Sequence, residues 1–303
     1  ITRPEQIIQS FPAAVQTMLD PADCGPACIA LSQDIQGQTF DYPEEFFKEK
    51  VHAIRRPRPD EFQIKEAAEK IAASKTFDNA TSCSSENSII ILDEVYNSFI
   101  DELSLVGCAT LPRSMENIIT DRLWQKGQLN REAIAQDADI LINALDLNDH
   151  VPKGTKFIGI ETDGIGDSYP LSGEKLSRVV SIYKAKDFSD SVLKAKKMLM
   201  HYGAGHSIGI HTNDKLRANK LAMTLPTCRV IVNQAHCFAT GGSFNNGMPF
   251  SLSMGCGSWG GNSIDDNLHW KHFLNVTKIV NEIPNKEPLL EDIFDKYWSK
   301  AGK

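Results

Sequence analysis

The sequence predicts an α/β fold built on a mostly parallel, doubly wound sheet. Three observations support this: short β-branched runs recur after Phe77, amphipathic helical segments separate them, and 303 residues suffice to bury a large core. Runs that are apolar throughout are typical of strands covered on both faces. Strands that alternate with helices favour parallel pairing, with helices on both sides of the sheet.

The candidate elements follow in order along this main domain. Strands are expected at 87–92, 156–162, 178–185, 206–212 and 229–235. Helices are expected at 112–128, 131–145 and 187–203. In the last of these, Asp187 is the expected N-cap and Gly203 the expected C-cap. The residues between the caps place an apolar stripe on one face, as an amphipathic helix requires.

The first 75 residues have a different character and predict a small α/β fragment with a linker. A helix is expected at 5–19, although Pro12 limits its continuity, and a short buried strand at 27–35. Arg-Pro repeats at 56–59 indicate an extended linker, and Asp60 is the expected N-cap of a helix over 60–74. The expected domains are therefore residues 1–75, residues 76–283 and a C-terminal tail, 284–303.

Charge and composition argue against several classes of protein. With 32 basic and 39 acidic residues the net charge is −7, which disfavours binding to nucleic acid or to an anionic membrane. No window approaches the roughly 18 apolar residues of a membrane span, and no signal sequence opens the chain. The odd count of seven cysteines then favours reduced thiols and a cytoplasmic location. No metal site is expected, because no second pair of ligands accompanies Cys24 and Cys28.

The segment KTFDNATSCSSENSIII, residues 75–91, places Cys83 among small hydroxyl residues just before a predicted strand. Such a turn can present a side chain and offer backbone N–H groups to an oxyanion. A lone cysteine in a polar turn is, however, more often a structural thiol than a catalytic one. From these residues alone both interpretations stay open.

A second unusual segment is the glycine-rich stretch at 239–263. Its glycines lack the GxxxxGK spacing of a nucleotide-binding phosphate loop. Their density indicates tight turns and close approach of the backbone, either to a ligand or within an irregular crossing loop.

Four segments together resemble the catalytic half of the CoA-acylating aldehyde dehydrogenases. They lie at 75–91, 172–188, 201–212 and 229–267, in the same order as in that family. The resemblance extends over about residues 75–282. It is strongest to members that act on sulfoacetaldehyde, so it implies the fold of that catalytic domain and an aldehyde substrate.

The resemblance also implies a reaction and its site. Cys83 would be the nucleophile that attacks the aldehyde carbonyl, with NAD or NADP taking the hydride and coenzyme A cleaving the resulting thioester. Glu174 would contact the nicotinamide-side ribose, and His206 would assist proton or CoA-thiol handling. For Glu174 the alternative is a solvated carboxylate, and for His206 a packed histidine.

The expected contacts with the anionic group of the substrate are His236, Ser243 and Asn245, in the last of the four segments. The family resemblance further implies a homo-oligomer, with the small aldehyde and coenzyme A as partners. Binding to nucleic acid or membrane is not expected.

Residues 1–75 resemble part of another family, the thiamine-diphosphate-dependent trihydroxycyclohexanedione hydrolases. The activating glutamate and the GDG motif of that family are absent, so thiamine diphosphate is not expected as a cofactor. The chain is therefore expected to be a fusion. No GxGxxG turn follows a predicted strand, so the nucleotide-binding domain is expected to be missing and the chain is expected to be inactive on its own.

Two alternatives to the enzyme follow. The chain is a non-catalytic fragment that acts in oligomerisation or interaction, or it is a cysteine hydrolase. The hydrolase would need the Cys83 thiol within hydrogen-bond reach of the His206 or His236 imidazole.

Overall fold

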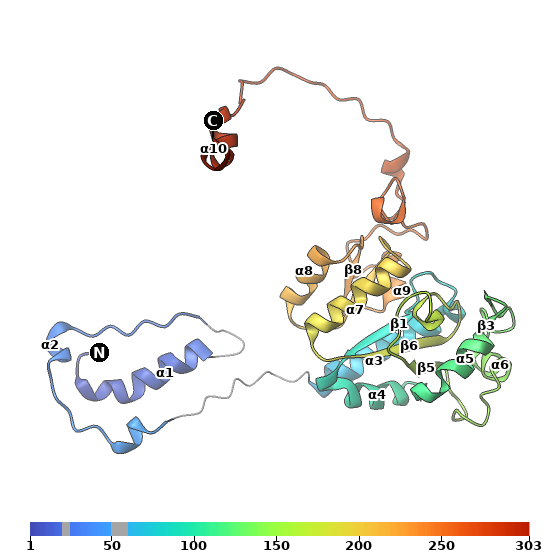
Figure 1. The fold of residues 1–303 in the computed structure, drawn as a ribbon, viewed down its shortest axis with the longest axis horizontal. Helices are drawn as coiled ribbons and strands as arrows, with labels where there is room; N and C mark the ends of the chain where they lie inside the picture. The colour runs from blue at the N-terminus through green and yellow to red at the C-terminus, as the bar shows by residue number, and fades with distance from the viewer. Residues whose placement is uncertain (20–24, 50–59, 303) are drawn as a thin grey trace.

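The computed structural model describes residues 1–19, 25–49 and 60–302. Its centre is a parallel four-stranded sheet in the order β1-β6-β5-β2 (Figure 1). The strands are β1 (Ser88–Leu92), β2 (Cys108–Leu111), β5 (Phe157–Glu161) and β6 (Val179–Ala185). The predicted α/β class and parallel pairing are confirmed.

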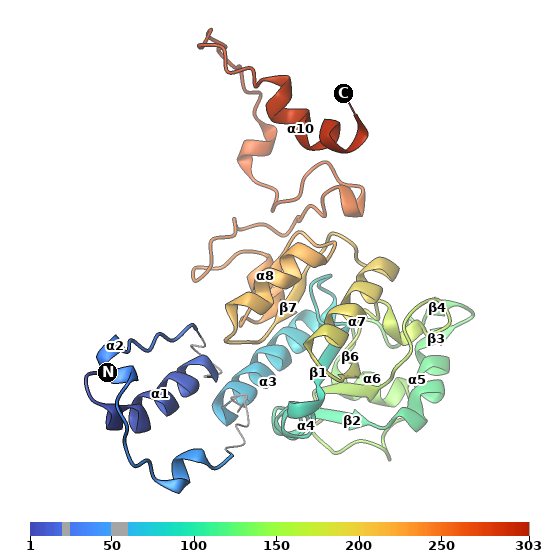
Figure 2. The same ribbon diagram turned by 60° about the vertical axis from the view of Figure 1, so that its left-hand side comes forward.

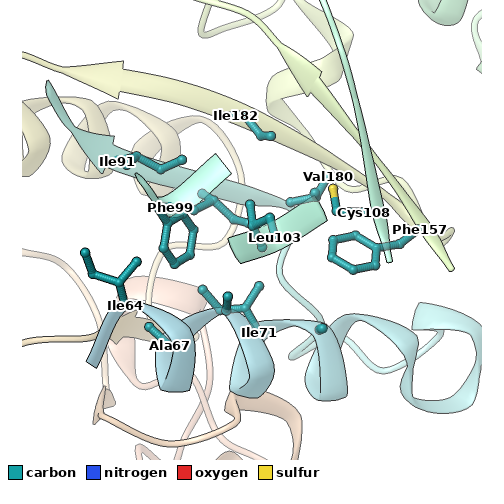
Figure 3. Packing of buried hydrophobic residues seen from close by; sticks show 13 residues of the cluster. Ile64, Ala67, Ile71, Ile91, Phe99, Leu103, Cys108, Phe157, Val180 and Ile182 are labelled. Carbon is teal, nitrogen blue, oxygen red and sulfur yellow. The ribbon is translucent and has the colours of Figure 1, made fainter. Parts of the chain in front are cut away.

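Helices cover both faces of this sheet, so it is doubly wound. On one face α3 (Glu61–Thr76) and α4 (Tyr96–Leu105) pack against the sheet, and Figure 3 shows Ile71 and Leu103 in this core. On the other face lie α5 (Glu116–Leu123) and α6 (Ala138–Ala144). The side chains of β5 and β6 are buried on both faces, and those of β1 are alternately buried and half-buried, which explains their continuously apolar sequences.

A smaller parallel sheet stands beside the first. It pairs β7 (Ile208–Ile210) with β8 (Val230–Val232) and packs against α7 (Phe188–His201) and α8 (Lys215–Thr224). The short helix α9 (His236–Thr240) follows β8. All five strands predicted after Phe77 exist, but they divide between two sheets, and β2 was not predicted.

The predicted helices are confirmed, four of them with shorter bounds, whereas the helix predicted at 60–74 extends two residues further, to Thr76. The Asp60 carboxylate accepts a hydrogen bond from Phe62 N at the start of α3, and the Asp187 carboxylate accepts one from Asp190 N at the start of α7. Residue 202 is the C-cap of α7, with Gly203 next at φ +101°. Of the predicted 112–128, Arg113–Met115 form a 3₁₀ turn, and the part after α5 belongs to a hairpin of β3 (Trp124–Gln125) and β4 (Gln128–Leu129).

Residues before α3 hold short helices: α1 (Ile7–Leu19), which continues through Pro12, and α2 (Gln33–Gln36). The strand expected at 27–35 was wrong, because this stretch is irregular and ends in α2, with only Ile35 buried. No described strand pairs with this stretch, so its apolar residues have no sheet to join. Figures 1 and 2 show α1 and α2 standing apart from the sheet. Cys24 and the Arg-Pro repeats lie outside the described residues.

Helix α3, which the sequence placed in the N-terminal fragment of residues 1–75, packs into the core of the main sheet and ends at Thr76. The expected boundary at 75/76 therefore falls at the end of a helix that belongs to this core. After the last of the glycine-rich residues, 274–289 lack helix and strand, and an exposed helix, α10 (Leu290–Ala301), follows.

Short 3₁₀ turns connect several of these elements. They lie at Pro4–Gln6, Glu44–Phe47, Phe77–Ala80, Asp93–Val95, Arg113–Met115, Pro170–Ser172, Ser258–Gly260 and Trp270–Phe273. Among the described helices, none has the length and apolarity needed to cross a membrane.

Candidate active site

Cys83 lies in the turn that joins the 3₁₀ turn Phe77–Ala80 to β1. Its side chain is exposed, whereas Ser84 and Ser85 beside it are buried. Ser85 N donates to the Ser82 carbonyl at 2.9 Å, and Ser84 N to Ser82 Oγ at 3.3 Å. The turn is thus anchored through its serines while the sulfur faces outward.

The backbone before this turn is strained. Asp78, Asn79 and Ala80 have φ of +46°, +52° and +60°, a region that L-residues with a side chain seldom adopt. Such conformations cost on the order of 1–3 kcal/mol each and persist only where packing enforces them. Their position directly ahead of Cys83 is consistent with a functional turn.

Helix α9 holds the turn from its other side. Thr240 Oγ1 donates to Ser84 Oγ at 2.8 Å, and Cys237 N donates to Ser74 Oγ at 2.9 Å. These bonds connect the end of α3, the cysteine turn and α9. The element that carries His236 is therefore part of the cysteine turn's support.

A buried charge pair lies beneath the turn. Lys75 Nζ donates to Ser85 Oγ at 3.4 Å, and the Glu86 carboxylate lies close enough for its charge to interact with the Lys75 ammonium. Desolvation raises the pKa of Glu86 to about 7 and lowers that of Lys75 to about 8, and each charge partly offsets the shift of the other. Both groups therefore titrate near neutral pH.

Glu174 is exposed, and the segment that carries it is tied to the end of the cysteine turn. Lys175 N donates to Asn87 Oδ1 at 3.0 Å, and Lys175 Nζ donates to the Asn87 carbonyl at 2.8 Å. Burial, with the Lys75 charge second, holds the pKa of Lys175 well below its usual range. Glu174 thus lies next to a residue, Lys175, that is hydrogen-bonded to Asn87, four residues after Cys83.

His206 and His236 are brought together by Ser207. The Ser207 hydroxyl lies 2.7 Å from His206 Nδ1 and 2.8 Å from His236 Nε2. Burial, followed by the Arg229 charge, lowers the pKa of His206. Burial, followed by the charges of His206 and His211, lowers the pKa of His236 to about 3.

Ser243 and Asn245 lie on the loop after α9 and contact each other, because Ser243 Oγ donates to Asn245 Oδ1. Asn245 is exposed and Ser243 half-buried. The loop is anchored by Asn246, whose Nδ2 donates to Gln234 Oε1 and the Ala239 carbonyl, both at 3.1 Å. The structure thus leaves Ser243 and Asn245 at the surface, and their role remains a prediction.

The glycine-rich segment makes close approaches within the protein. A Cβ on Gly205, at φ +84°, would lie 1.9 Å from the Cys256 carbonyl oxygen. A Cβ on Gly242, at φ +87°, would lie 2.7 Å from the Pro249 carbonyl oxygen. At these two positions the glycines permit backbone-to-backbone contact inside an irregular loop.

One buried side chain with several hydrogen bonds, that of Arg229, was not predicted from the sequence. Arg229 is 4% exposed, and its Nε and Nη2 donate to Asn267 Oδ1 at 3.2 and 3.0 Å. Its Nη1 donates to the carbonyls of Gly255 and His206, at 2.9 and 3.3 Å. Arg229 thereby ties the glycine-rich loop to the segment before β7. The only available signal was an arginine at the entry to an apolar strand.

The hydrolase alternative lacks its defining contact. Through the part of the chain that the structure describes, no hydrogen bond joins the Cys83 sulfur to His206 or His236. In the same residues, no group of three or more His, Cys, Asp or Glu side chains is placed to hold a metal ion.

Comparison with known proteins gives consistent sequence relatives, although no protein-family model matches the chain. A sulfoacetaldehyde dehydrogenase (acylating) of Cupriavidus necator is 43% identical over 240 residues, which cover 79% of this chain and 49% of that protein. A sulfoacetaldehyde dehydrogenase of an Acholeplasma species is 35% identical over 254 residues, covering 80% of this chain and 52% of the relative. The chain thus spans about half the length of these curated relatives.

Solved structures give the same result for the fold. An acetylating aldehyde dehydrogenase from Geobacillus thermoglucosidasius matches with a TM-score of 0.67 and 29% identity, over 74% of this chain and 49% of that one. A probable aldehyde dehydrogenase from Listeria monocytogenes matches with a TM-score of 0.68 and 28% identity, over 76% and 49%.

These findings confirm the resemblance proposed from the four sequence segments. They lend no support to the resemblance of residues 1–75 to a thiamine diphosphate enzyme. The chain is therefore related to the acylating aldehyde dehydrogenases over about four fifths of its length, and it corresponds to about half of such an enzyme.

Proposed function

We propose that this chain carries the acyl-transfer centre of an aldehyde dehydrogenase that converts an aldehyde, sulfoacetaldehyde by its relatives' names, into an acyl-CoA. The observation that supports this best is the exposed Cys83 thiol on a turn held by buried hydrogen bonds. A fixed turn with an accessible sulfur suits a nucleophile, since positioning and access both favour attack on a carbonyl.

In the proposed reaction the Cys83 thiolate attacks the aldehyde carbon and forms an S–C bond. NAD or NADP, when bound, supplies the hydride acceptor for the oxidation that leaves a thioester on Cys83. The exposed carboxylate of Glu174 fits a contact with the hydroxyl groups of the nucleotide ribose. The backbone N–H of Cys83 would donate to the oxyanion.

Release of the product requires coenzyme A. Its thiol would lose a proton to His206, and its sulfur would attack the thioester carbon, so that the Cys83 thiolate leaves. Ser243 and Asn245 offer hydroxyl and amide groups that suit an anionic group of the substrate. A homo-oligomer in the cytoplasm remains part of this proposal.

Acyl exchange tests the proposed function without a nicotinamide nucleotide. The chain is incubated with acetyl-CoA, and acyl transfer to Cys83 is followed by mass spectrometry of peptides. We expect an acetyl thioester on Cys83 that free coenzyme A removes. Cys28→Ala, which deletes another exposed thiol, should leave the exchange unchanged. An acetyl group that remains in Cys83→Ala would contradict the proposal.

A second candidate function rests on α10. Its exposed apolar side chains recur at helical spacing, at Leu290, Ile293, Phe294 and Tyr297. An amphipathic helix at the end of an irregular segment is suited to an interaction module, the non-catalytic alternative. Light scattering of the chain with and without Ile293→Asp tests it, and an unchanged mass would contradict self-association through this face.

A further inference from the structure

The Ser207 hydroxyl lies between two imidazole rings and carries a single hydrogen. It is 2.7 Å from His206 Nδ1 and 2.8 Å from His236 Nε2, both within hydrogen-bond distance. If both contacts are hydrogen bonds, the hydroxyl donates to one ring and accepts from the other. The two rings and the hydroxyl are thus joined by two consecutive hydrogen bonds that both run in the same direction.

Both rings are neutral at ordinary pH. Burial lowers the pKa of each, and the cation of Arg229 adds to the effect at His206. His211, whose pKa is lowered to about 4 by burial and the Lys70 charge and partly restored by Glu66, adds to the effect at His236. A neutral imidazole has one N–H, so the hydrogen bonds from His206 through Ser207 to His236 can run in only two directions.

The remaining nitrogen of His206 distinguishes these arrangements. His206 Nε2 is buried and has no hydrogen-bond partner among the described residues. If Ser207 donates to His206 Nδ1, the hydrogen of the His206 ring is on Nε2, which leaves a buried donor unsatisfied. If His206 Nδ1–H donates to Ser207, Nε2 bears a lone pair. Orphaned buried N–H groups are the rarer of the two in proteins, which favours the lone pair.

We propose that Ser207 and His236 are positioning residues that fix His206 in the tautomer protonated at Nδ1, so that the lone pair that can accept a proton lies on Nε2. His206 Nδ1–H donates to Ser207 Oγ, and the Ser207 hydroxyl donates to His236 Nε2. His236 therefore acts on His206, and contact with the anionic group of the substrate is left to Ser243 and Asn245.

This inference rests on the proposed function and gives the base its substrate, the thiol of coenzyme A. The S–H bond breaks, the proton binds to His206 Nε2, and the sulfur electron pair attacks the acyl carbon as the Cys83 thiolate leaves. His236 does not take the proton, because its environment strongly disfavours the imidazolium form. The hydrogen-bonded series His206–Ser207–His236, called the relay below, thus sets the orientation and the tautomer of the His206 ring and does not move charge away from it.

The tautomer can be measured directly in the full chain. Two-dimensional ¹H–¹⁵N NMR of ¹⁵N-histidine-labelled protein at pH 7 distinguishes protonated from unprotonated ring nitrogens, and His206→Gln assigns the signals. We expect the His206 ring protonated at Nδ1 and bare at Nε2. A His206 ring protonated at Nε2 in the unmodified chain would overturn the proposal without any variant.

Variants of Ser207 test whether its hydroxyl fixes the tautomer of His206. Ser207→Ala removes the hydroxyl, and the His206 signals should become those of mixed tautomers. Ser207→Thr keeps the hydroxyl and should restore the single tautomer, while Ser114→Ala, at an exposed serine, should change nothing. An unchanged tautomer in Ser207→Ala would exclude the relay.

Acyl exchange gives the functional readout. Ser207→Ala should slow transfer from acetyl-CoA to Cys83 about tenfold, which is less than the roughly 10²–10⁴ that a general base contributes because the base itself is retained. Ser207→Thr should recover most of the lost rate. The NMR result does not depend on Cys83. If Cys83 never acquires the acyl group although the tautomer is as described, the proposed function fails and the relay stands.

Discussion

Thr240 and Ser84 are 156 residues apart in the chain, and Thr240 Oγ1 donates a hydrogen bond to Ser84 Oγ across 2.8 Å in the protein interior. The bond connects α9 to the residue that follows Cys83. Thr240→Val should leave the Ser84 hydroxyl unpaired and cost about 1–3 kcal/mol of unfolding free energy. Urea denaturation measures this cost.

The double variant Ser84→Ala/Thr240→Val is the matched control, because it removes both hydroxyls. It should be more stable than the sum of the single changes predicts, since neither partner is left unpaired. Strict additivity of the two costs would show that the bond does not support the turn.

The carboxylate of Glu86 should make stability depend on pH. Its pKa is raised from 4.5 to about 7 in the folded chain, so the folded state binds more protons than the unfolded state between these values. The stabilisation from this group is therefore present at low pH and is lost as pH rises through about 7. Glu86→Gln should lack this fall. Glu174→Gln, at an exposed carboxylate, should retain it, and parallel pH profiles for all three chains would contradict the assignment.

Much of the main domain was predictable because its strands are β-branched and continuously apolar. β1, β5 and β6 follow that pattern and were expected within a residue or two of their bounds. β2, only four residues long and containing Ala and Thr, carries too weak a signal. Residues 27–35 carry a comparable apolar run, but no strand within 1–19, 25–49 and 60–302 pairs with it, so the sequence pattern alone gave a wrong prediction there.

The site was predictable only in part. The cysteine turn was expected from its local sequence, and its exposure agrees with a nucleophile. The partners that hold it depend on packing between distant segments, as for Lys75 with Glu86 or Arg229 with Asn267. No local pattern encodes such pairs, which is why the relay through Ser207 was missed although both histidines were named.

Alkylation should distinguish the cysteines by access and by pKa. Cys83 and Cys28 are exposed, whereas Cys108 and Cys237 are buried. Burial raises the pKa of Cys108 to about 12 and that of Cys237 above its usual value, and each pKa unit lowers the thiolate fraction about tenfold. With limiting iodoacetamide at pH 8, peptide mass spectrometry should find Cys83 modified well before Cys108 or Cys237. Modification of Cys237 ahead of Cys83 would mean that the turn is closed in solution.

Two glycines with the same φ separate the cost of backbone strain from the cost of a steric contact. Gly205 and Gly154 both have φ +84°, but a Cβ on Gly205 would meet the Cys256 carbonyl at 1.9 Å, and one on Gly154 would meet nothing within 4 Å. Gly154→Ala should cost about 1–2 kcal/mol from the left-handed conformation alone. Gly205→Ala should cost about 1–3 kcal/mol more, since the glycine-rich loop must shift.

Urea denaturation of both variants measures the difference. Acyl exchange should slow in Gly205→Ala and stay unchanged in Gly154→Ala, because Gly205 lies next to His206 and Ser207 in the chain and contacts the loop that Arg229 ties to the His206 carbonyl. Equal losses of stability in the two variants would mean that the contact between Gly205 and Cys256 contributes nothing to holding this loop in place.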